Sequence, residues 1–209
     1  MPSNPECFGR IFLAALAKNH SVIFVNVNYR RGVFVFLASE ALSARSYPKT
    51  SGNYGLGDLV SALKWVSLNI NHFGGHPRRV TVMGRGSGAT LITALTAVPQ
   101  AKGLFQQIWV TNGAGAFENK TVTKAVEENE EILKKLNCDK TDLQCLLDAS
   151  AEDMVESAPY EWLDTTQSEL PQKNDKEHSW IIVDRHLLPI HPIDYWKRHR
   201  MTNEIKMVF

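Results

Sequence analysis

The feature that most constrains this chain is a short apolar run that leads into a dense group of glycines and then into an apolar helix. Residues 80–83 favour a buried strand, and residues 84–88 hold three glycines at alternate positions. Residues 87–98 then favour a helix that ends before Pro99. Glycine is needed where a turn is too tight for a side chain or where φ is positive. The pattern therefore predicts a strand–turn–helix unit of an α/β fold.

The turn resembles a known catalytic motif but lacks its reactive atom. Gly84 and Gly88 occupy the outer positions of the pattern G-x-S-x-G, in which α/β-hydrolases carry their nucleophile on a sharp strand-to-helix turn. The two variable positions are Arg85 and Ser87, and the apex is Gly86, which has no side chain. The simplest interpretation is a tight turn that has kept its glycines and lost its nucleophile.

Two other interpretations of the turn compete with this one. Ser87 would be the nucleophile, but successive residues of a helix point about 100° apart, so its hydroxyl should face away from a base built for position 86. Gly84, Gly86 and Ala89 also imitate a dinucleotide fingerprint, G-x-G-x-x-A. That motif requires an acidic residue about 20 positions later, at the end of the next strand. The next strand candidate is followed by Asn112, so this signal is weak.

Length and composition are compatible with one soluble globular domain and exclude some partners. The chain has 209 residues, of which 44% are hydrophobic and 22% are charged, and its net charge is +1. This balance argues against nucleic acid as the main partner. No run approaches the roughly 18 apolar residues that a membrane span needs. Residues 11–17 imitate a signal peptide with its cleavage site, but they fit a short helix better because the apolar run is so short.

Strand and helix patterns alternate along the first half of the chain, which predicts a parallel α/β sheet. The strand candidates are rich in β-branched and aromatic residues and comprise residues 21–29, 80–83, 107–111, 180–184 and 205–209. Residues 21–29 are apolar almost throughout, as expected of a central strand buried on both faces. A helix follows Asp58 and should stop at Gly74 and Gly75.

The second half predicts a helical insertion. Residues 122–136 form one amphipathic helix, in which Glu130 and Glu131 each precede a lysine by four residues. Thr141 and Ser150 each open a capping box and should begin two short helices. Such an insertion often covers the carboxyl edge of a parallel sheet, where ligands bind.

Cysteines and glycosylation sequons point to the outside of the cell. Cys138 and Cys145 enclose a short polar loop and would close a small disulfide ring, although two reduced thiols are the expectation for a cytosolic protein. Asn19 and Asn119 each begin an N-x-S/T sequon. Cys7 has no assigned role. The histidines show no spacing that marks a catalytic base or a metal site, and no cofactor is expected.

Several segments occur in an order that resembles the type-B carboxylesterase/cholinesterase family of α/β-hydrolases. They are residues 25–30 (VNVNYR), 32–34 (GVF), 52–56 (GNYGL), 62–66 (ALKWV), 69–70 (NI) and 73–81 (FGGHPRRVT). The chain departs from the family at His76, where Asp is usual, and at Arg85 and Gly86, where Glu-Ser is usual.

The second half resembles the neurotactin-like branch of this family, whose members are non-catalytic adhesion proteins. The segments that carry this likeness are residues 88–91, 138, 144–146, 162, 169–171, 180, 183–184, 191–192 and 196–198. The resemblance implies a membrane glycoprotein whose esterase-like domain lies outside the cell and mediates heterophilic cell–cell adhesion. It also implies a disulfide between Cys138 and Cys145.

The expected architecture is therefore a partial α/β-hydrolase fold over residues 1–209, with the sheet and elbow in residues 20–115 and the helical insertion and return strand in residues 116–209. The resemblance implies that the oxyanion segment precedes residue 1, that the catalytic Glu and His follow residue 209, and that the membrane anchor lies outside the chain. The expected partner is an extracellular protein ligand or a cell-surface receptor. The alternatives are an ester hydrolase that uses Ser87, or a fragment without function whose apolar strand edges are exposed.

Overall fold

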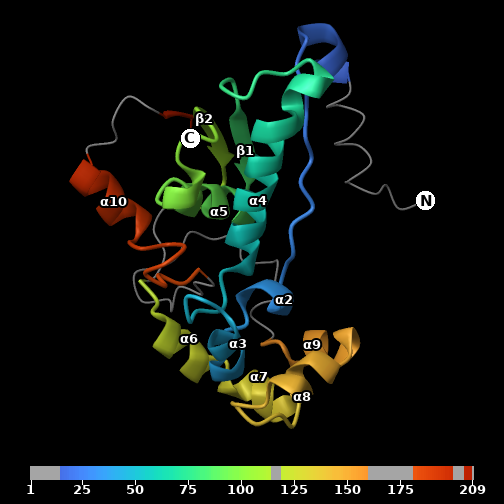
Figure 1. Ribbon diagram of the computed structural model, residues 1–209, viewed down its shortest axis with the longest axis vertical. Coiled ribbons are helices and arrows are strands. Elements are labelled where there is room, and N and C mark those ends of the chain that lie inside the picture. Colours follow the sequence, from blue (N-terminus) through green and yellow to red (C-terminus); the bar gives the residue numbers. More distant parts are fainter. Residues whose placement is uncertain (1–14, 114–118, 160–180, 200–204, 209) are drawn as a thin grey trace.

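A parallel sheet with helices packed on it forms the centre of the protein. The computed structural model describes residues 15–113, 119–159, 181–199 and 205–208. Its sheet has the order β1 (Thr81–Arg85), β2 (Gln107–Thr111) and β3 (Lys206–Val208), and both pairings are parallel. Helix α5 (Ser87–Leu95) packs on β1 and β2, and α4 (Tyr54–Asn69) packs on α5 (Figure 1). The predicted α/β architecture is confirmed, and β2 has the predicted bounds.

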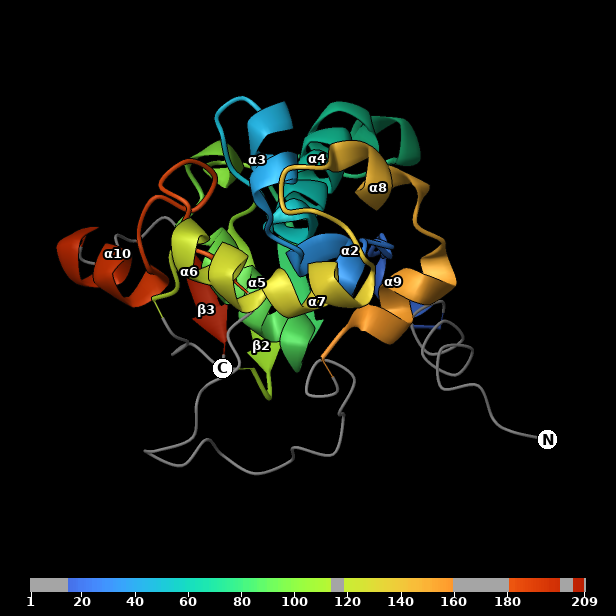
Figure 2. The same ribbon diagram turned by 90° about the horizontal axis from the view of Figure 1, so that it is seen from below.

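The main core lies between this sheet and the two helices. Leu56, Leu95 and Ile108 are almost completely buried there, one from each of α4, α5 and β2. Figure 2 shows the molecule from below, so that the helices beyond the carboxyl ends of the strands lie in front of the sheet. A short helix η2 (Pro99–Ala101) connects α5 to β2.

Helix α4 ends as predicted but begins earlier. It continues into η1 (Ile70–Phe73), and Gly74 closes it with φ 81° while its N–H donates to the carbonyl of Asn71 (3.0 Å). The predicted start at Asp58 is wrong, because the helix begins at Tyr54 and includes two glycines. A Cβ on Gly55 would lie 2.7 Å from Cγ1 of Val35, so glycine lets this first turn approach a neighbouring helix closely.

The prediction of a central buried strand at residues 21–29 is wrong. The segment is extended, but it enters no sheet in the described part of the chain. Val22, Ile23 and Val25 are 40–46% exposed. An apolar pattern favours an extended backbone, but a central strand also needs a neighbouring strand on each side to bind its backbone N–H and C=O groups. None of the described strands lies next to this segment.

The helical insertion forms a second cluster beyond the carboxyl ends of β1 and β2 (Figure 1). Its helices are α6 (Val122–Glu128), α7 (Glu130–Lys135), α8 (Leu143–Asp148) and α9 (Ala151–Ser157), and they pack with α2 (Val33–Phe36) and α3 (Glu40–Arg45). Ile132 is fully buried within it. The insertion thus lies at the predicted end of the sheet.

The single helix predicted over residues 122–136 is divided into α6 and α7 at Asn129. This side chain is buried, and its amide donates to the carbonyls of Phe36 and Ala38 (both 3.4 Å). The amphipathic pattern is continuous, so it did not reveal the break. The predicted pair of Glu130 and Lys134 is present at 4.0 Å.

One of the two predicted capping boxes is correct. Ser150 precedes α9, and its Oγ accepts from the N–H of Asp153 (3.0 Å). The prediction of a capping box at Thr141 is wrong. Asp142 caps α8 instead, because its Oδ1 accepts from the N–H of Cys145 (3.0 Å). Thr141 instead donates through its N–H and its hydroxyl to Oδ1 of Asp139.

The return segment is held by buried polar contacts rather than by a long strand. The predicted strand at residues 180–184 reduces, in its described part, to one bridge between Ile182 and Lys120. Asn53 supplies a substitute for strand pairing: its Nδ2 donates to the Ile182 carbonyl (2.6 Å), and its Oδ1 accepts from the Ile182 N–H (3.1 Å). Helix α10 (Pro192–His199) then attaches to α5 through Trp196, whose Nε1 donates to Oγ1 of Thr96 (2.9 Å).

The predicted short helix near the start of the chain is helical over residues 15–20. Within the described ranges, no helix has the length and apolarity to cross a membrane. Some predictions lie outside the described residues: those at residues 11–14, Cys7, Trp162, residues 169–171 and Trp180.

Candidate functional site: an elbow with glycine at its apex

The turn between β1 and α5 has the backbone of a sharp strand-to-helix elbow. Gly86 is the single residue between the two elements, with φ 58° and ψ −127°. Its N–H donates to the carbonyl of Thr111 in β2 (3.0 Å), and its carbonyl accepts from the N–H of Thr90 in α5 (3.1 Å). The apex is therefore fixed to both the sheet and the helix.

The space available for a side chain differs among the glycines around the apex. A Cβ on Gly84 would lie 2.9 Å from the backbone of Gly88 and 2.5 Å from Cδ1 of Ile92, so α5 would have to move. A Cβ on Gly113 would overlap Ala89 in the same helix. A Cβ on Gly88 would meet the hydroxyl of Tyr29 at an ordinary 3.6 Å. Close packing of α5 on the sheet therefore requires Gly84 and Gly113.

The apex itself has room for a side chain. A Cβ on Gly86 would meet no atom within 4 Å. Sterics thus do not demand glycine at this position, but the positive φ does favour it, since such conformations cost residues with side chains about 1–3 kcal/mol. The turn thus has the backbone and the free space expected at a nucleophile position, but its apex residue is a glycine without a side chain.

The polar residues beside the apex point outward. Arg85 ends β1 and Ser87 begins α5, and both are exposed. Three of the described histidines have local roles. Nδ1 of His76 accepts from the N–H of Arg78 (3.1 Å), Nδ1 of His191 accepts from the N–H of Ile193 (3.2 Å), and His199 stacks on a tyrosine one turn earlier in α10.

Comparison with known proteins assigns this elbow to a family. The model of the carboxylesterase family matches residues 10–209. The chain belongs to the carboxylesterase family. Neurotactin of Drosophila melanogaster is 38% identical over 199 residues, which cover 93% of this chain and 23% of neurotactin. Neuroligin-3 of Mus musculus is 37% identical over 147 residues, covering 68% of this chain and 17% of neuroligin-3.

A solved esterase has the same fold. The crystal structure of the carboxylesterase EST55 of Geobacillus stearothermophilus matches with a TM-score of 0.74 and 30% identity, over 92% of this chain and 37% of EST55. The predicted family, its neurotactin-like branch and the partial α/β-hydrolase fold are thereby confirmed. The chain spans about a quarter of the length of neurotactin and over a third of the length of EST55.

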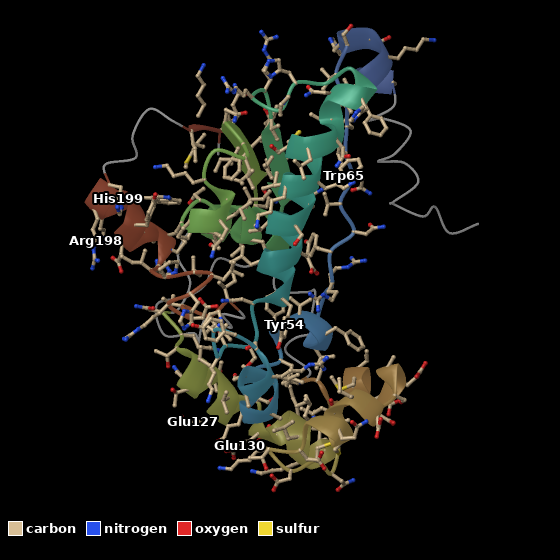
Figure 3. All side chains as sticks on the ribbon, viewed as in Figure 1. Tyr54, Trp65, Glu127, Glu130, Arg198 and His199 are labelled. Carbon is tan, nitrogen blue, oxygen red and sulfur yellow. A yellow bond between two sulfur atoms is a disulfide. The ribbon has the colours of Figure 1, made fainter. Side chains whose placement is uncertain are left out.

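An ion pair attaches the extended segment to the start of α4 in this family member. Nε and Nη2 of Arg30 donate to the two carboxylate oxygens of Asp58, at 2.9 Å and 2.7 Å. The same guanidinium lies over the ring of Tyr54, which begins α4 (Figure 3). The hydrogen bond from Arg30 holds the pKa of the Asp58 carboxyl below its ordinary value. Burial raises the pKa of the Tyr54 hydroxyl. Sequence patterns did not reveal this contact, because its partners are 28 residues apart.

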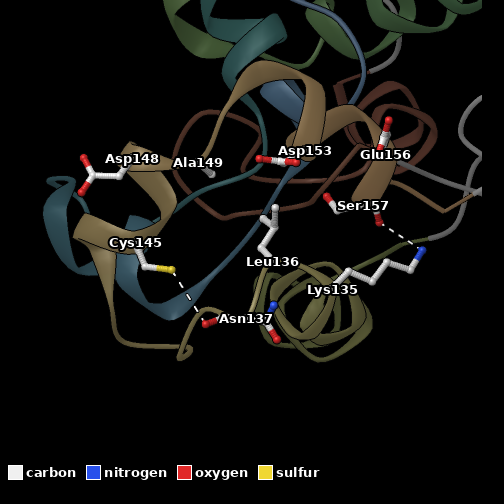
Figure 4. Close-up of a pocket in the computed structure, with 9 residues that line it drawn as sticks. All are labelled: Lys135, Leu136, Asn137, Cys145, Asp148, Ala149, Asp153, Glu156 and Ser157. Carbon is white, nitrogen blue, oxygen red and sulfur yellow. Dashed lines mark hydrogen bonds between the residues drawn. The ribbon is translucent and has the colours of Figure 1, made fainter.

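The predicted disulfide is present and borders a cavity. Cys138 and Cys145 are bonded, with their Cα atoms 5.7 Å apart. The cavity has a volume of about 570 Å³, and Figure 4 shows the residues that line it. Three of them are acidic, namely Asp148, Asp153 and Glu156. Lys135 donates across its rim to the carbonyl of Ser157 (3.2 Å) and links α7 to α9.

No metal centre or sugar attachment is established. Among the described residues, no three His, Cys, Asp or Glu side chains are grouped so as to hold a metal ion. The sequon asparagines Asn19 and Asn119 are both exposed. The hydroxyl of Thr121, in the second sequon, caps α6 by accepting from the N–H of Lys124 (3.3 Å). Glycosylation at both asparagines stays a prediction.

Proposed function

We propose that this chain is a non-catalytic carboxylesterase-family domain that mediates protein–protein recognition in cell adhesion. It acts at the extracellular face of the plasma membrane and binds a different protein, either an extracellular ligand or a cell-surface receptor. The similarity to neurotactin over nearly the whole chain supports this assignment, since the neurotactin-like branch implies adhesion.

The observation that carries the proposal is the glycine at the apex of the elbow. Covalent acyl transfer needs a nucleophilic oxygen at that position, and Gly86 supplies none. Loss of the serine from a comparable triad lowers turnover by about a millionfold. The elbow backbone is otherwise intact, so the absence of the oxygen does not follow from a distorted turn.

The disulfide supports an extracellular location. Disulfides persist in oxidising compartments and are rare in the cytosol. The ring closed by Cys138 and Cys145 lies in the helical insertion, and the two exposed sequons suit the same compartment. An extracellular location and a glycine at the apex are both compatible with a domain that binds another protein.

A second candidate function is ester hydrolysis through Ser87. The observation in its favour is that Ser87 is exposed beside the open apex, at the first position of α5. A helix N-terminus favours a developing negative charge, as an activated serine would require. The two functions make opposite predictions for covalent labelling.

The discriminating experiment is labelling of the full-length protein that contains this chain with a fluorophosphonate probe, followed by mass spectrometry of the peptide that spans residues 79–93. We expect no covalent tag on the unmodified protein, and Ser87→Ala is the matched control. A tag that disappears in Ser87→Ala would establish the enzyme and refute the proposal. We expect Gly86→Ser, made in the full-length protein, to give no esterase turnover unless the distant acid and base are also in place, because it restores the apex oxygen alone.

Adhesion is tested with beads coated with the chain and added to cultured neuronal cells. Heterophilic recognition predicts that the beads bind cells but do not bind one another. Binding no greater than that of albumin-coated beads would contradict the adhesion role. Clustering of the beads without cells would show that the chain binds a second copy of itself, which would contradict heterophilic recognition.

A further inference from the structure

Two loops at the amino end of the sheet carry exposed cations. The first loop joins η1 to β1 and contains Arg78 and Arg79, and the second joins η2 to β2 and begins with Lys102. All three residues are exposed, and none of them takes part in an ion pair with another described residue. Figure 1 shows the first loop at the end of the sheet opposite the helical insertion.

The side chain of Gln106 joins the two loops to each other. Its Oε1 accepts from the N–H of Val80 (2.9 Å), the residue after Arg79. Its Nε2 donates to the carbonyl of Gly103 (3.3 Å), the residue after Lys102. Both loops lie wholly within the described residues and lead into strands that pair with each other, about 4.8 Å apart. The arrangement of the cations therefore does not depend on the open edges of the sheet.

Further hydrogen bonds fix the backbone that carries the cations. Nδ1 of His76 accepts from the N–H of Arg78 (3.1 Å), and the His76 carbonyl accepts from the N–H of Arg79 (3.0 Å). The N–H of Lys102 donates to the carbonyl of Pro99 (3.1 Å). A loop that is already ordered loses less conformational entropy when it binds a ligand, so this backbone is prepared for binding.

Negative charge is absent from this part of the sequence. No Asp or Glu occurs between Asp58 and Glu118, whereas the same stretch contains three arginines and two lysines. No carboxylate of this stretch can therefore compensate the cations of the two loops. Their positive charge is available to attract an anionic ligand.

The surroundings of the three cations favour a polyanion over the apolar surface of another protein. Protein interfaces usually have an apolar centre. The exposed large hydrophobic side chains of the described chain include none from residues 76–80 or 102–107. Arginine binds oxyanions with two parallel donors, and neutralising the charges of a polyanion releases counterions without any apolar contact. Outside the cell, sulfated polysaccharides carry such oxyanions along a linear chain.

We propose that Arg78, Arg79 and Lys102 form a basic site that binds a sulfated polysaccharide of the cell surface or the extracellular matrix. The polysaccharide crosses the starts of β1 and β2, and its sulfate groups bind the three cations. The proposal rests on the extracellular location in the proposed function. It depends neither on the glycine at the apex nor on the protein partner, because the basic site lies at the opposite end of β1 from the elbow.

The probe is a fluorescein-labelled heparin hexasaccharide, titrated with the full-length protein that contains this chain while fluorescence anisotropy is recorded. The controls are a hyaluronan hexasaccharide, which has carboxylates but no sulfates, and a polyglutamate peptide with the same net charge as the heparin. We expect saturable binding of heparin and at least about tenfold weaker binding of both controls. With three cations engaged, the logarithm of the association constant should fall against the logarithm of the salt concentration with a slope of about −2. Absence of heparin binding, or equal binding of either control, would overturn the proposal.

Two matched double variants locate the site on the protein. Arg78→Gln/Arg79→Gln removes two cations of the basic site, and Arg45→Gln/Lys49→Gln removes two exposed cations near the start of α4. The 16 residues of α4 span about 24 Å, which exceeds the screening length of about 8 Å at physiological ionic strength. The first variant should weaken heparin binding at least about tenfold, and the second less than about twofold. Equal effects would contradict the proposed site.

A second matched pair leaves the charge unchanged and tests Gln106 as a positioning residue. Gln106→Ala removes the link between the loops, whereas Gln107→Ala removes a contact with the hydroxyl of Thr81 (3.2 Å). Gln106→Ala should weaken heparin binding at least about threefold and also reduce the salt slope, since fewer cations bind at the same time. Gln107→Ala should change neither. An unchanged salt slope in a Gln106→Ala protein that folds, as checked by circular dichroism, would overturn the two-loop site.

The heparin titration and the bead assay distinguish this proposal from the proposed function. The titration uses purified protein and a defined ligand, so it requires no adhesion partner. Loss of heparin binding with intact adhesion of beads to cells would overturn the basic site alone. Heparin binding without bead adhesion would overturn the adhesion function and support the basic site.

Discussion

Alanine at two elbow glycines should destabilise the protein by different amounts and for different reasons. Gly84→Ala introduces a Cβ that meets the backbone of Gly88 at 2.9 Å, and Gly86→Ala introduces one that meets no atom within 4 Å. The first substitution tests close packing of α5 against β1. The second tests only the positive φ of the apex.

The structure sets the size of each effect. At Gly86, strain of about 1–3 kcal/mol for a side chain at φ 58° and ψ −127° is partly offset by about 0.4–1 kcal/mol from the more restricted unfolded chain. The expected net loss is about 1 kcal/mol. At Gly84, Cδ1 of Ile92 can rotate away but the Gly88 backbone cannot, so α5 must shift. Such overpacking costs about 3 kcal/mol, at the upper end of the usual range.

Urea unfolding followed by circular dichroism measures both losses. With a denaturant slope of about 2–3 kcal/mol/M, Gly86→Ala should lower the midpoint by roughly 0.4 M and Gly84→Ala by more than about 1 M. The unmodified chain should unfold in one cooperative transition, which also tests the hypothesis of a fragment without stable structure. Equal losses, or a larger loss for Gly86→Ala, would refute the elbow geometry.

Two further substitutions test contacts that are distant in sequence. Asn53→Leu removes both hydrogen bonds to the backbone of Ile182 and leaves its buried N–H and C=O groups unsatisfied. It should lower the free energy of unfolding by about 3 kcal/mol in the same urea assay, and a loss below about 1 kcal/mol would contradict this. Asp58→Asn weakens the partly exposed pair with Arg30 and should cost about 0.5–1 kcal/mol at pH 7. Because the pKa of Asp58 is lowered in the folded state, that contribution is present above about pH 4 and lost as the pH falls, so the variant and the unmodified chain should converge in stability in acid. A difference that persists below the folded pKa would assign the effect to another cause.

Sequence patterns predicted the elements that depend on local signals. The glycine-rich turn, the strand at Gln107–Thr111 and the Gly74 stop of α4 all depend on signals within a few residues. The pairing of Cys138 with Cys145 followed from the family resemblance, and the ring they close is short.

The failures have non-local causes. Residues 21–29 have the composition of a buried strand, but the described chain supplies no strand beside them. The long helix of the insertion breaks at Asn129 because carbonyls some 90 residues earlier bind its side chain. Asn53 likewise binds a segment 129 residues away. Neither asparagine shows a local pattern that distinguishes it from a surface residue.

Backbone contacts explain why the sharp turn between β1 and α5 forms with glycine at its apex. Gly86 joins β2 and α5 through its own backbone hydrogen bonds, and Gly84 allows α5 to lie close to β1. These contacts stabilise the sheet whether or not the apex carries an oxygen. A Cβ at the apex would gain no packing, because it meets no atom within 4 Å, and it would add backbone strain. If the protein is non-catalytic, as proposed, glycine at position 86 is the more stable choice, and the elbow remains because the packing of its helix and sheet depends on it.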